Sequence, residues 1–229
     1  MKHVTTFKWV VALLVILAIT QPVSAQFTKA DVFDESKPIT FLGVDYSLTT
    51  FIGTPENKSY GFSPWTVVGG KDNGVVTNDQ FRDDFTAQWN QLFIDEPKKY
   101  DIAKATGRST VKYAIDVAIK ANKALGKKNF FSNNPTDFHT KNETDVANAV
   151  KGYDFGNNDG IGLMFFVEGM EKGITSEGVW VTFVDIKSKT VLFTTYQTGK
   201  PGGSGFRNYW AKPIFEIVKN MESDFKKWK

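Results

Sequence analysis

The stretch from Thr198 to Trp210 contains the residue types best suited to hold a ligand. It reads Thr-Gly-Lys-Pro-Gly-Gly-Ser-Gly-Phe-Arg-Asn-Tyr-Trp and lies between a predicted strand and a predicted helix. In that setting backbone N–H groups and a helix N-terminus can hold an anion, and Arg207 can add a bidentate contact to phosphate or carboxylate. The candidate binding residues are Lys200, Gly202, Gly203, Ser204, Gly205, Arg207, Asn208, Tyr209 and Trp210.

The same stretch has a simpler interpretation as a flexible strand-to-helix connection. It matches neither G-x-x-x-x-G-K-[ST] nor G-x-G-x-x-G, the two common phosphate-binding motifs. In this interpretation Phe206, Tyr209 and Trp210 anchor the connection to the core. Both interpretations make predictions about where these side chains lie.

Metal chemistry has little support in the sequence. The loop Asp154–Gly160 is rich in Asp and Asn, but counting from Asp154 puts Gly156, Asp159 and Phe165 where a calcium loop needs a ligand, a glycine and a glutamate. After the N-terminal segment the chain contains one histidine, His139, and no cysteine, so a zinc or iron site is not expected. We interpret His139 as a surface or helix-cap residue and expect no metal and no cofactor.

Catalysis also lacks a clear set of residues. There is no G-x-S-x-G motif and no thiol, and His139 is the one imidazole that could act as a base. Two carboxylates, Asp45 and Asp185, lie in or at the end of predicted strands, and an enzyme that works through carboxylates such as these is the alternative to a binding protein. Only their geometry can show whether they form an acid–base pair. No catalytic residue is assigned.

The last seventy residues predict the elements that position these side chains. Residues 160–168, 179–186 and 190–198 are apolar, β-branched and aromatic, which predicts three successive strands forming an antiparallel meander. The first of them is apolar on both alternating faces and is expected to be covered on both sides. An apolar stripe at helical spacing then predicts one long C-terminal helix with Pro213 in its first turn; it comprises Trp210, Ile214, Ile217, Val218, Met221, Phe225 and Trp228.

The first half of the chain predicts a strand, a long loop and two helices. Residues 39–48 form the strand and residues 49–77 an aromatic, glycine-rich loop. A helix is expected from Thr77 or Asn78, with Gln80 completing a capping box, and a shorter one after the box formed by Thr140 and Glu143. Residues 110–119 fit both a strand and a helix, and their β-branched content favours a strand.

The N-terminus predicts a secretory signal peptide over residues 1–25. Lys2, His3 and Lys8 precede a short apolar run, and Val23-Ser24-Ala25 is typical of a cleavage site, so the mature chain is expected to begin at Gln26. The apolar run is too short for the ~20 residues that span a bilayer, and no cysteine exists for a lipid anchor or a disulfide. We therefore expect a secreted or periplasmic protein.

The net charge gives no reason to expect nucleic acid or an anionic membrane as a partner. The full chain has 28 basic and 25 acidic residues, and removing Lys2 and Lys8 leaves 26 minus 25, a net charge of +1. A nearly neutral chain offers no whole-molecule attraction for nucleic acid or an anionic membrane. The predicted fold is a single α/β (α+β-like) domain over residues 26–229, with a mixed sheet of about five strands packed against about three helices.

Three runs of sequence carry a resemblance to known proteins. GIGLMFFVEGMEK, VWVTFVDIKSKTVLFT and GSGFRNYWAKPI resemble a group of uncharacterised secreted proteins of Bacteroidetes-type bacteria, from about Asp145 onward. The pattern from Val184 to Leu192 is more distantly similar to periplasmic α/β domains of the curli-secretion-lipoprotein and TolB N-terminal type. Those lipoproteins carry an anchoring cysteine that this chain lacks, so the resemblance implies fold and compartment only.

The leading functional prediction is a non-catalytic exported envelope protein. It would bind an envelope protein or a small anionic ligand through the glycine-rich stretch and the aromatic loop of residues 49–77. The alternatives are a carboxylate-dependent hydrolase or other enzyme, and a purely structural envelope component.

Overall fold

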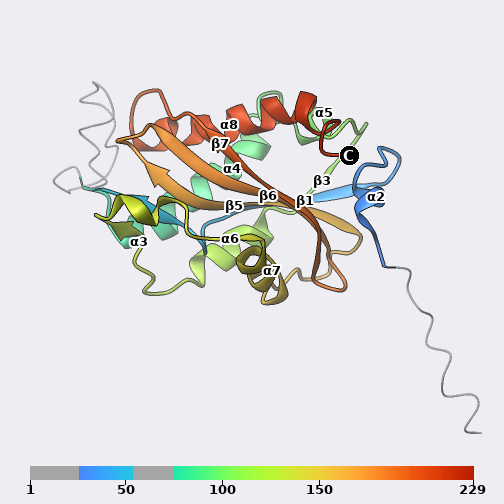
Figure 1. The fold of residues 1–229 in the computed structure, drawn as a ribbon, viewed down its shortest axis with the longest axis horizontal. Helices are drawn as coiled ribbons and strands as arrows, with labels where there is room; N and C mark the ends of the chain where they lie inside the picture. The colour runs from blue at the N-terminus through green and yellow to red at the C-terminus, as the bar shows by residue number, and fades with distance from the viewer. Residues whose placement is uncertain (1–25, 54–74) are drawn as a thin grey trace, which may run out of the picture.

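The computed structural model describes residues 26–53 and 75–229. The predicted signal peptide and most of the predicted aromatic loop, residues 54–74, lie outside the described residues. Within the described ranges the chain forms one mixed sheet with helices on both of its faces (Figure 1). No helix in these ranges is long and apolar enough to cross a membrane.

The sheet has seven strands in the described residues, where the sequence predicted about five. They are β1 (Ile39–Asp45), β2 (Thr50–Ile52), β3 (Lys112–Tyr113), β4 (Phe131–Ser132), β5 (Ile161–Glu171), β6 (Ser176–Asp185) and β7 (Thr190–Gly199). The order along the main path is β3-β1-β5-β2-β4, with β6 and then β7 continuing from β5. All pairs among β1 to β5 are parallel, whereas β5–β6 and β6–β7 are antiparallel. The predicted meander is thus confirmed in part, because antiparallel pairing is limited to this side of a mostly parallel sheet.

Strand β5 is the centre of the sheet, and its sequence explains why. Leu163, Phe165 and Val167 face one hydrophobic core, and Met164 and Phe166 face the other. All five side chains are fully buried, as predicted for a strand covered on both sides. β1 and β2 pair one after the other along the same edge of β5, so together they act as one interrupted strand.

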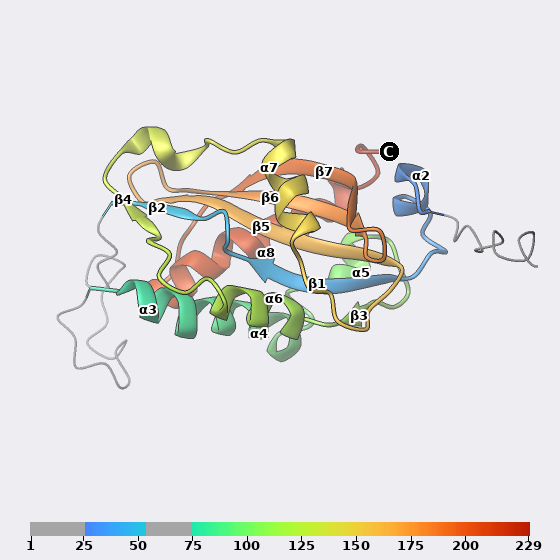
Figure 2. The ribbon, with the colours of Figure 1, turned by 90° about the horizontal axis from the view of Figure 1, so that it is seen from below.

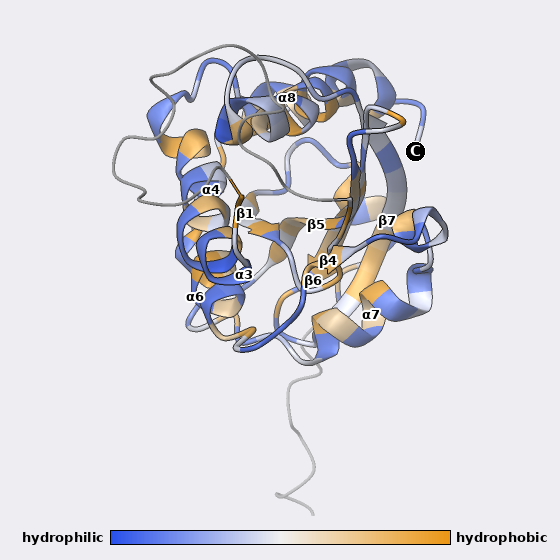
Figure 3. Ribbon diagram, turned by 90° about the vertical axis from the view of Figure 1, so that its left-hand side faces the viewer, coloured by the Kyte–Doolittle hydropathy of each residue, from blue (hydrophilic) through white to orange (hydrophobic). Residues whose placement is uncertain are grey.

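The helices cover both faces of the sheet and one of its sides. α8 lies on one face and α7 on the other, while α4 and α6 run along the side formed by β1 (Figures 2 and 3). This exceeds the three helices that the sequence predicted. The helices are α2 (Lys29–Val32), α3 (Asn78–Gln80), the π-helical turn η2 (Phe81–Phe85), α4 (Thr86–Asp95), α5 (Ile102–Ala105), α6 (Asp116–Lys123), the 3-10 turn η3 (Pro135–Phe138), α7 (Glu143–Lys151) and α8 (Phe206–Asp224).

Two predicted helix starts can be compared with the structure. Thr77 and Gln80 form the expected capping box at the start of α3. α7 begins as predicted near residue 143, but its box is made by Asn142 and Asp145, not by Thr140. Asn142 accepts hydrogen bonds from the first backbone N–H groups of α7, which a threonine two residues earlier does not reach.

The preference for a strand over residues 110–119 is wrong, because only Lys112 and Tyr113 are extended and α6 begins at Asp116. Tertiary contacts decide between the two periodicities. Ala118 is fully buried and packs against Gly43 of β1. A Cβ added at Gly43 would lie only 2.8 Å from the Cβ of Ala118. The helix also brings Asn122 to the backbone of β1, and these contacts override the β-branched content.

Two buried asparagines fasten α4 and α6 to β1. Asn90 accepts a hydrogen bond from the N–H of Val44 and donates one to its carbonyl, at 2.8 and 2.9 Å. Asn122 donates to the same carbonyl and accepts from the N–H of Tyr46, at 2.9 and 2.8 Å. The end of β1, which β3 does not reach, is therefore satisfied by side chains instead of another strand.

Candidate functional site

The connection between β7 and α8 folds back over the first turns of the helix. At Gly199 an added Cβ would lie 2.5–2.8 Å from backbone atoms of Pro213, so only glycine allows this approach. α8 begins at Phe206, so Pro213 is not in the first turn as predicted but well inside the helix. Proline lacks the N–H that would bond the carbonyl of Tyr209, and that carbonyl instead accepts the N–H of Gly202 at 3.1 Å. The proline thus frees the acceptor that fastens the loop.

A pocket of about 320 Å³ lies between this connection, α8 and the end of α4. Three separate segments of the chain build it, namely α4, the turn that follows it, and the connection with the first half of α8. Its lining residues are Leu92, Glu96, Lys99, Tyr100, Gly202, Gly203, Arg207, Asn208, Ala211, Lys212 and Phe215.

Positive charge predominates among the residues that line this pocket. Lys99, Arg207 and Lys212 contribute three cations against the single carboxylate of Glu96. Lys99 pairs with Glu96 at 3.0 Å, while Lys212 pairs at 3.3 Å with Glu216, which is outside the lining. These ion pairs are partly exposed and therefore weak, so an incoming anion can compete for both ammonium groups.

Lys212 and Lys99 each pack closely against other residues that line the pocket. The side chain of Lys212 passes over Gly202, where an added Cβ would lie 3.1 Å from its Cδ and 3.2 Å from its Nζ. Lys99 Nζ lies 5.3 Å and 5.4 Å from the ring centres of Tyr100 and Phe215. Such cation–π geometry holds the ammonium group over an aromatic surface. The pocket therefore combines cations with an aromatic wall.

Tyr100 contributes a neutral polar group to this wall. Its hydroxyl donates to the carbonyl of Ala211 at 3.1 Å, which ties the turn after α4 to α8. Burial raises the pKa of Tyr100 well above its ordinary value, with a smaller contribution from the negative charge of Glu96. The phenol stays protonated at any pH at which the fold is studied, so it adds no negative charge to the pocket.

The structure brings four of the nine sequence-predicted residues into this pocket. They are Gly202, Gly203, Arg207 and Asn208, and the Arg207 guanidinium donates to the Asn208 side chain at 3.0 Å. The other five do not line it: Lys200 and Ser204 are exposed, Gly205 precedes α8, Tyr209 packs on Trp210, and Trp210 is buried against Phe51. The aromatic residues of the stretch thus serve the core, while Arg207 and the glycines face the pocket.

Sequence reasoning missed most of the opposite wall. Lys99 and Tyr100 follow the end of α4 and carry no motif. Lys212 and Phe215 could have been found from the sequence. Arg207, Ala211 and Phe215 are spaced four residues apart, with Lys212 next to Ala211, so they share one face of a helix that begins at Phe206. The predicted helix began near Trp210 and therefore left Arg207 out of that face.

The two carboxylates that the sequence offered for an enzyme, Asp45 and Asp185, do not come together in the fold. Asp45 pairs in register with Phe166 of β5 and Asp185 with Ile161. These positions are five residues apart (166 minus 161), about 16 Å along the strand, and lie on opposite sides of β5. The paired carboxylates of glycoside hydrolases lie within about 10 Å of each other, so Asp45 and Asp185 are not a pair of that kind.

Each of these two carboxylates has a local structural role. Asp45 is buried, and its oxygens accept from the hydroxyls of Tyr153 and Ser47. Burial raises the pKa of Asp45, and the hydrogen bonds oppose that shift. Asp185 accepts the backbone N–H groups of Lys187 and Ser188 and so closes the turn between β6 and β7.

His139 does more than the surface or cap role assigned to it. It follows η3, and its Nδ1 lies 2.8 Å from Oε2 of the buried Glu168. Glu168 also accepts the indole N–H of Trp180 at 2.8 Å and the backbone N–H groups of Thr140 and Lys141. Glu168 lies at a bulge of β5, and its contacts hold the segment before α7 against the sheet. Among the described residues no group of three or more His, Asp or Glu side chains is placed to hold a metal.

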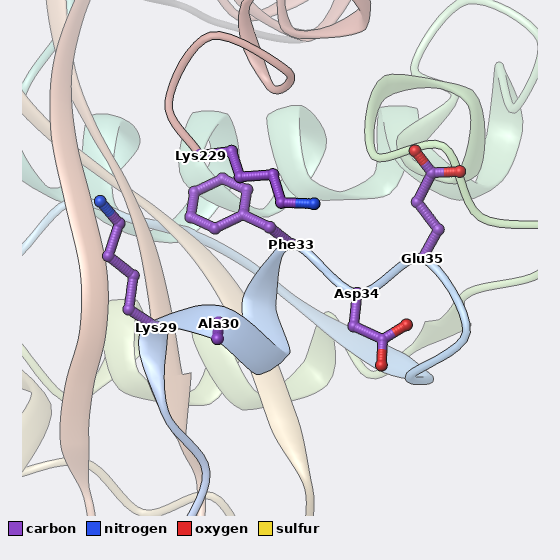
Figure 4. Close-up of a pocket in the computed structure, with 6 residues that line it drawn as sticks. All are labelled: Lys29, Ala30, Phe33, Asp34, Glu35 and Lys229. Atoms are coloured by element: carbon purple, nitrogen blue, oxygen red, sulfur yellow. The ribbon is translucent and has the colours of Figure 1, made fainter.

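A larger pocket of about 660 Å³ lies where α2 meets the C-terminal segment. Lys29 and Lys229 flank Phe33, while Asp34 and Glu35 point in other directions (Figure 4). Its two cations and two anions do not converge on one point. It therefore lacks the charge selectivity of the pocket beside α8.

No protein-family model and no curated protein matches the chain. The geometry of the pocket beside α8 is therefore the basis for assigning a function.

Proposed function

We propose that this chain is an exported, non-catalytic binding module of the cell envelope, with one α/β domain over residues 26–229. Its ligand is a small organic anion that carries a phosphate or carboxylate group and an apolar or aromatic part. The binding site is the pocket beside α8. The signal-peptide pattern of residues 1–25 supports export, and the pocket supports the choice of ligand.

One observation carries the proposal. Lys99 follows α4, whereas Arg207 and Lys212 lie on α8 about a hundred residues later, and all three line one pocket. Arg207 has the planar donor pattern that matches carboxylate and phosphate oxygens. Tyr100 and Phe215 add an aromatic surface for the rest of the ligand. A purely structural component has no need for such a convergence.

The experiment is a thermal-shift screen of residues 26–229, followed by calorimetric titration of each hit. The panel contains inorganic phosphate, sulfate, sugar phosphates, aliphatic carboxylates and aromatic carboxylates. At a ligand concentration about 100 times Kd, binding should raise Tm by about 5–10 °C. Organic anions with an aromatic part should outperform inorganic phosphate and sulfate.

Matched variants separate the pocket from general charge effects. Arg207→Ala and Lys212→Ala should each reduce affinity about 10-fold or more, since each removes a charge-assisted contact. Lys219→Ala removes an exposed lysine of the same helix outside the pocket and should leave affinity unchanged. Equal losses in all three variants, or no binding of any anion, would refute the proposal and favour a structural envelope component.

A further inference from the structure

The N-terminal segment of the described chain is attached to the start of β7. Gln26 donates a hydrogen bond from Nε2 to Oγ1 of Thr190, the first residue of β7, at 3.1 Å. Phe27 packs against the core under α8, and the ring of Phe33 lies 5.2 Å from that of Phe193. The segment therefore contacts the sheet from its first described residue onward.

Asp185 is the polar group that this segment meets. The residue is 4% exposed, and its Oδ1 accepts the N–H groups of Lys187 and Ser188 in the turn between β6 and β7. Its Oδ2 accepts the N–H of Phe27 at 3.3 Å. A carboxylate oxygen can accept two hydrogen bonds, so Oδ2 can receive a second donor from the same direction.

A pocket of about 560 Å³ lies beside this carboxylate, and its charge is negative. Asp159 and Asp185 contribute two carboxylates against the single exposed ammonium group of Lys187. Within the described residues neither carboxylate has an ion-pair partner. A buried carboxylate is costly without a cation nearby. The pocket therefore favours a positive charge close to Asp185.

Cleavage after Ala25 supplies such a charge at this place. It converts the peptide nitrogen of Gln26, which lines the pocket, from a neutral amide into an ammonium group. One residue spans at most about 3.6 Å of chain, so this nitrogen lies within about 7 Å of Oδ2 of Asp185 before any bond rotates. Once it is free of residue 25, it can turn toward either carboxylate.

We propose that removal of residues 1–25 completes an ion pair between the α-ammonium group of Gln26 and the carboxylates of Asp185 and Asp159. The pair fastens the mature N-terminus to the turn between β6 and β7. This inference rests on the proposed export, and it concerns a different part of the molecule from the pocket beside α8. The domain thus reaches its full stability only after the leader has been removed.

Two chains with defined N-termini test the ion pair. One begins at Gln26 and the other at Ala25, and each is released from a cleavable fusion. The longer chain keeps its positive charge but moves it one residue away from the pocket. At low salt the Tm of the shorter chain should be about 1–3 °C higher. About 0.5 M salt should reduce this difference at least two-fold, because salt screens partly exposed ion pairs. Intact mass checks that Gln26 has not cyclised with loss of ammonia, which would remove the amine.

Matched variants in both chain lengths identify the partner of the amine. Asp185→Asn removes the charge and keeps an oxygen for the N–H groups of Lys187 and Ser188, and it should reduce the Tm difference by at least half. Asp159→Asn should reduce it less. Asp84→Asn, at an exposed site outside the pocket, should leave it unchanged. Any cost that is common to both chain lengths cancels in this comparison.

Equal Tm values for the two wild-type chains would overturn the inference. A difference that withstands salt and both pocket variants would do the same, because it would then come from the extra residue and not from the charge. Anion affinity of the pocket beside α8 should be the same in both chains. A failed ion pair therefore leaves the ligand-binding proposal standing, and a lack of anion binding leaves the ion pair standing.

Discussion

Glu177 places a carboxyl group inside the core. It is 1% exposed, and its side chain lies on the same face of β6 as those of Val179 and Val181, which belong to the core under α8. Neither carboxyl oxygen has a hydrogen-bond partner in the part of the chain that the structure describes. Burial raises the pKa of Glu177 well above its ordinary value. Burial therefore favours the protonated form of this side chain in the folded protein.

This raised pKa predicts how stability depends on pH. Below the ordinary glutamate pKa of about 4.3, the folded and unfolded states are both protonated. Above it the unfolded chain ionises first, so the free energy of unfolding falls with rising pH until the folded-state pKa is passed. Glu177→Gln should therefore be more stable than the wild type at pH 7 by about 1–3 kcal/mol, and the gain should shrink toward pH 4.

Urea denaturation of both proteins at intervals from pH 4 to 8 measures this effect. Glu171→Gln, a glutamate at the partly exposed end of β5, serves as the control and should change stability by less than about 0.5 kcal/mol. A stability difference between Glu177→Gln and the wild type that does not vary with pH would contradict the raised pKa of Glu177.

Glu168 is a buried acid of the opposite kind, because its oxygens receive four donors. Replacing it by glutamine turns one acceptor oxygen into an N–H group that faces two of those donors. Glu168→Gln should lower the free energy of unfolding by about 2–4 kcal/mol and loosen the segment before α7. Hydrogen exchange of the Thr140 and Lys141 amides should accelerate in this variant. His139→Gln, which removes one half-exposed donor, should cost less than half as much.

At the scale of elements, the packing of β7 against α8 depends on a missing side chain. Gly199→Ala should lower the free energy of unfolding by about 2–4 kcal/mol, because its Cβ would overlap backbone atoms of Pro213 that cannot move aside. Gly173→Ala is the control, since its nearest neighbour would lie at an ordinary 3.4 Å. Thermal unfolding of the two variants compares them directly. Equal effects would show that loss of glycine, not the close approach, is responsible.

The sequence predicted correctly those elements whose apolar residues repeat with a single period, either that of a strand or that of a helix. β5, β6 and β7 follow from alternating apolar residues, and α8 follows from its stripe. α6 was misassigned because its residues satisfy both periods, and the decision came from Asn122 and Ala118 meeting β1. The short strands β3 and β4 carry two residues each, too few for any pattern.

The candidate site likewise has one part that the sequence predicted and one part that it did not. Arg207 and the neighbouring glycines were predictable because they form a continuous stretch between two elements. Lys99 and Tyr100 reach the pocket only through the packing of α4 and α5 against α8. No spacing rule joins residues a hundred positions apart, so this half of the site needed the fold.

At the scale of the whole molecule, export is the property that can be measured most directly. When the full chain is expressed with its N-terminal segment in a bacterial host, the exported protein should begin at Gln26, as read by intact mass. Ala25→Leu places a large residue where the cleavage pattern needs a small one and should leave the precursor uncut. Ala25→Ser keeps a small residue and should be processed normally. A wild-type product that retains residues 1–25 would contradict the predicted signal.

The topology of the sheet has a consequence for how the chain acquires its structure. β1 pairs with the two-residue strand β3 at Thr40 and Phe41, but its long partner β5 begins at Ile161, so most of its ladder cannot form until more than half of the chain has been synthesised. Contacts between such distant segments form slowly. The hairpins β5–β6 and β6–β7 join neighbouring strands and can form quickly once they are synthesised, but they lie in the last third of the chain. The sheet therefore cannot close before β5 has been synthesised, and late closure suits a chain that, under the proposed export, must still be threaded across a membrane.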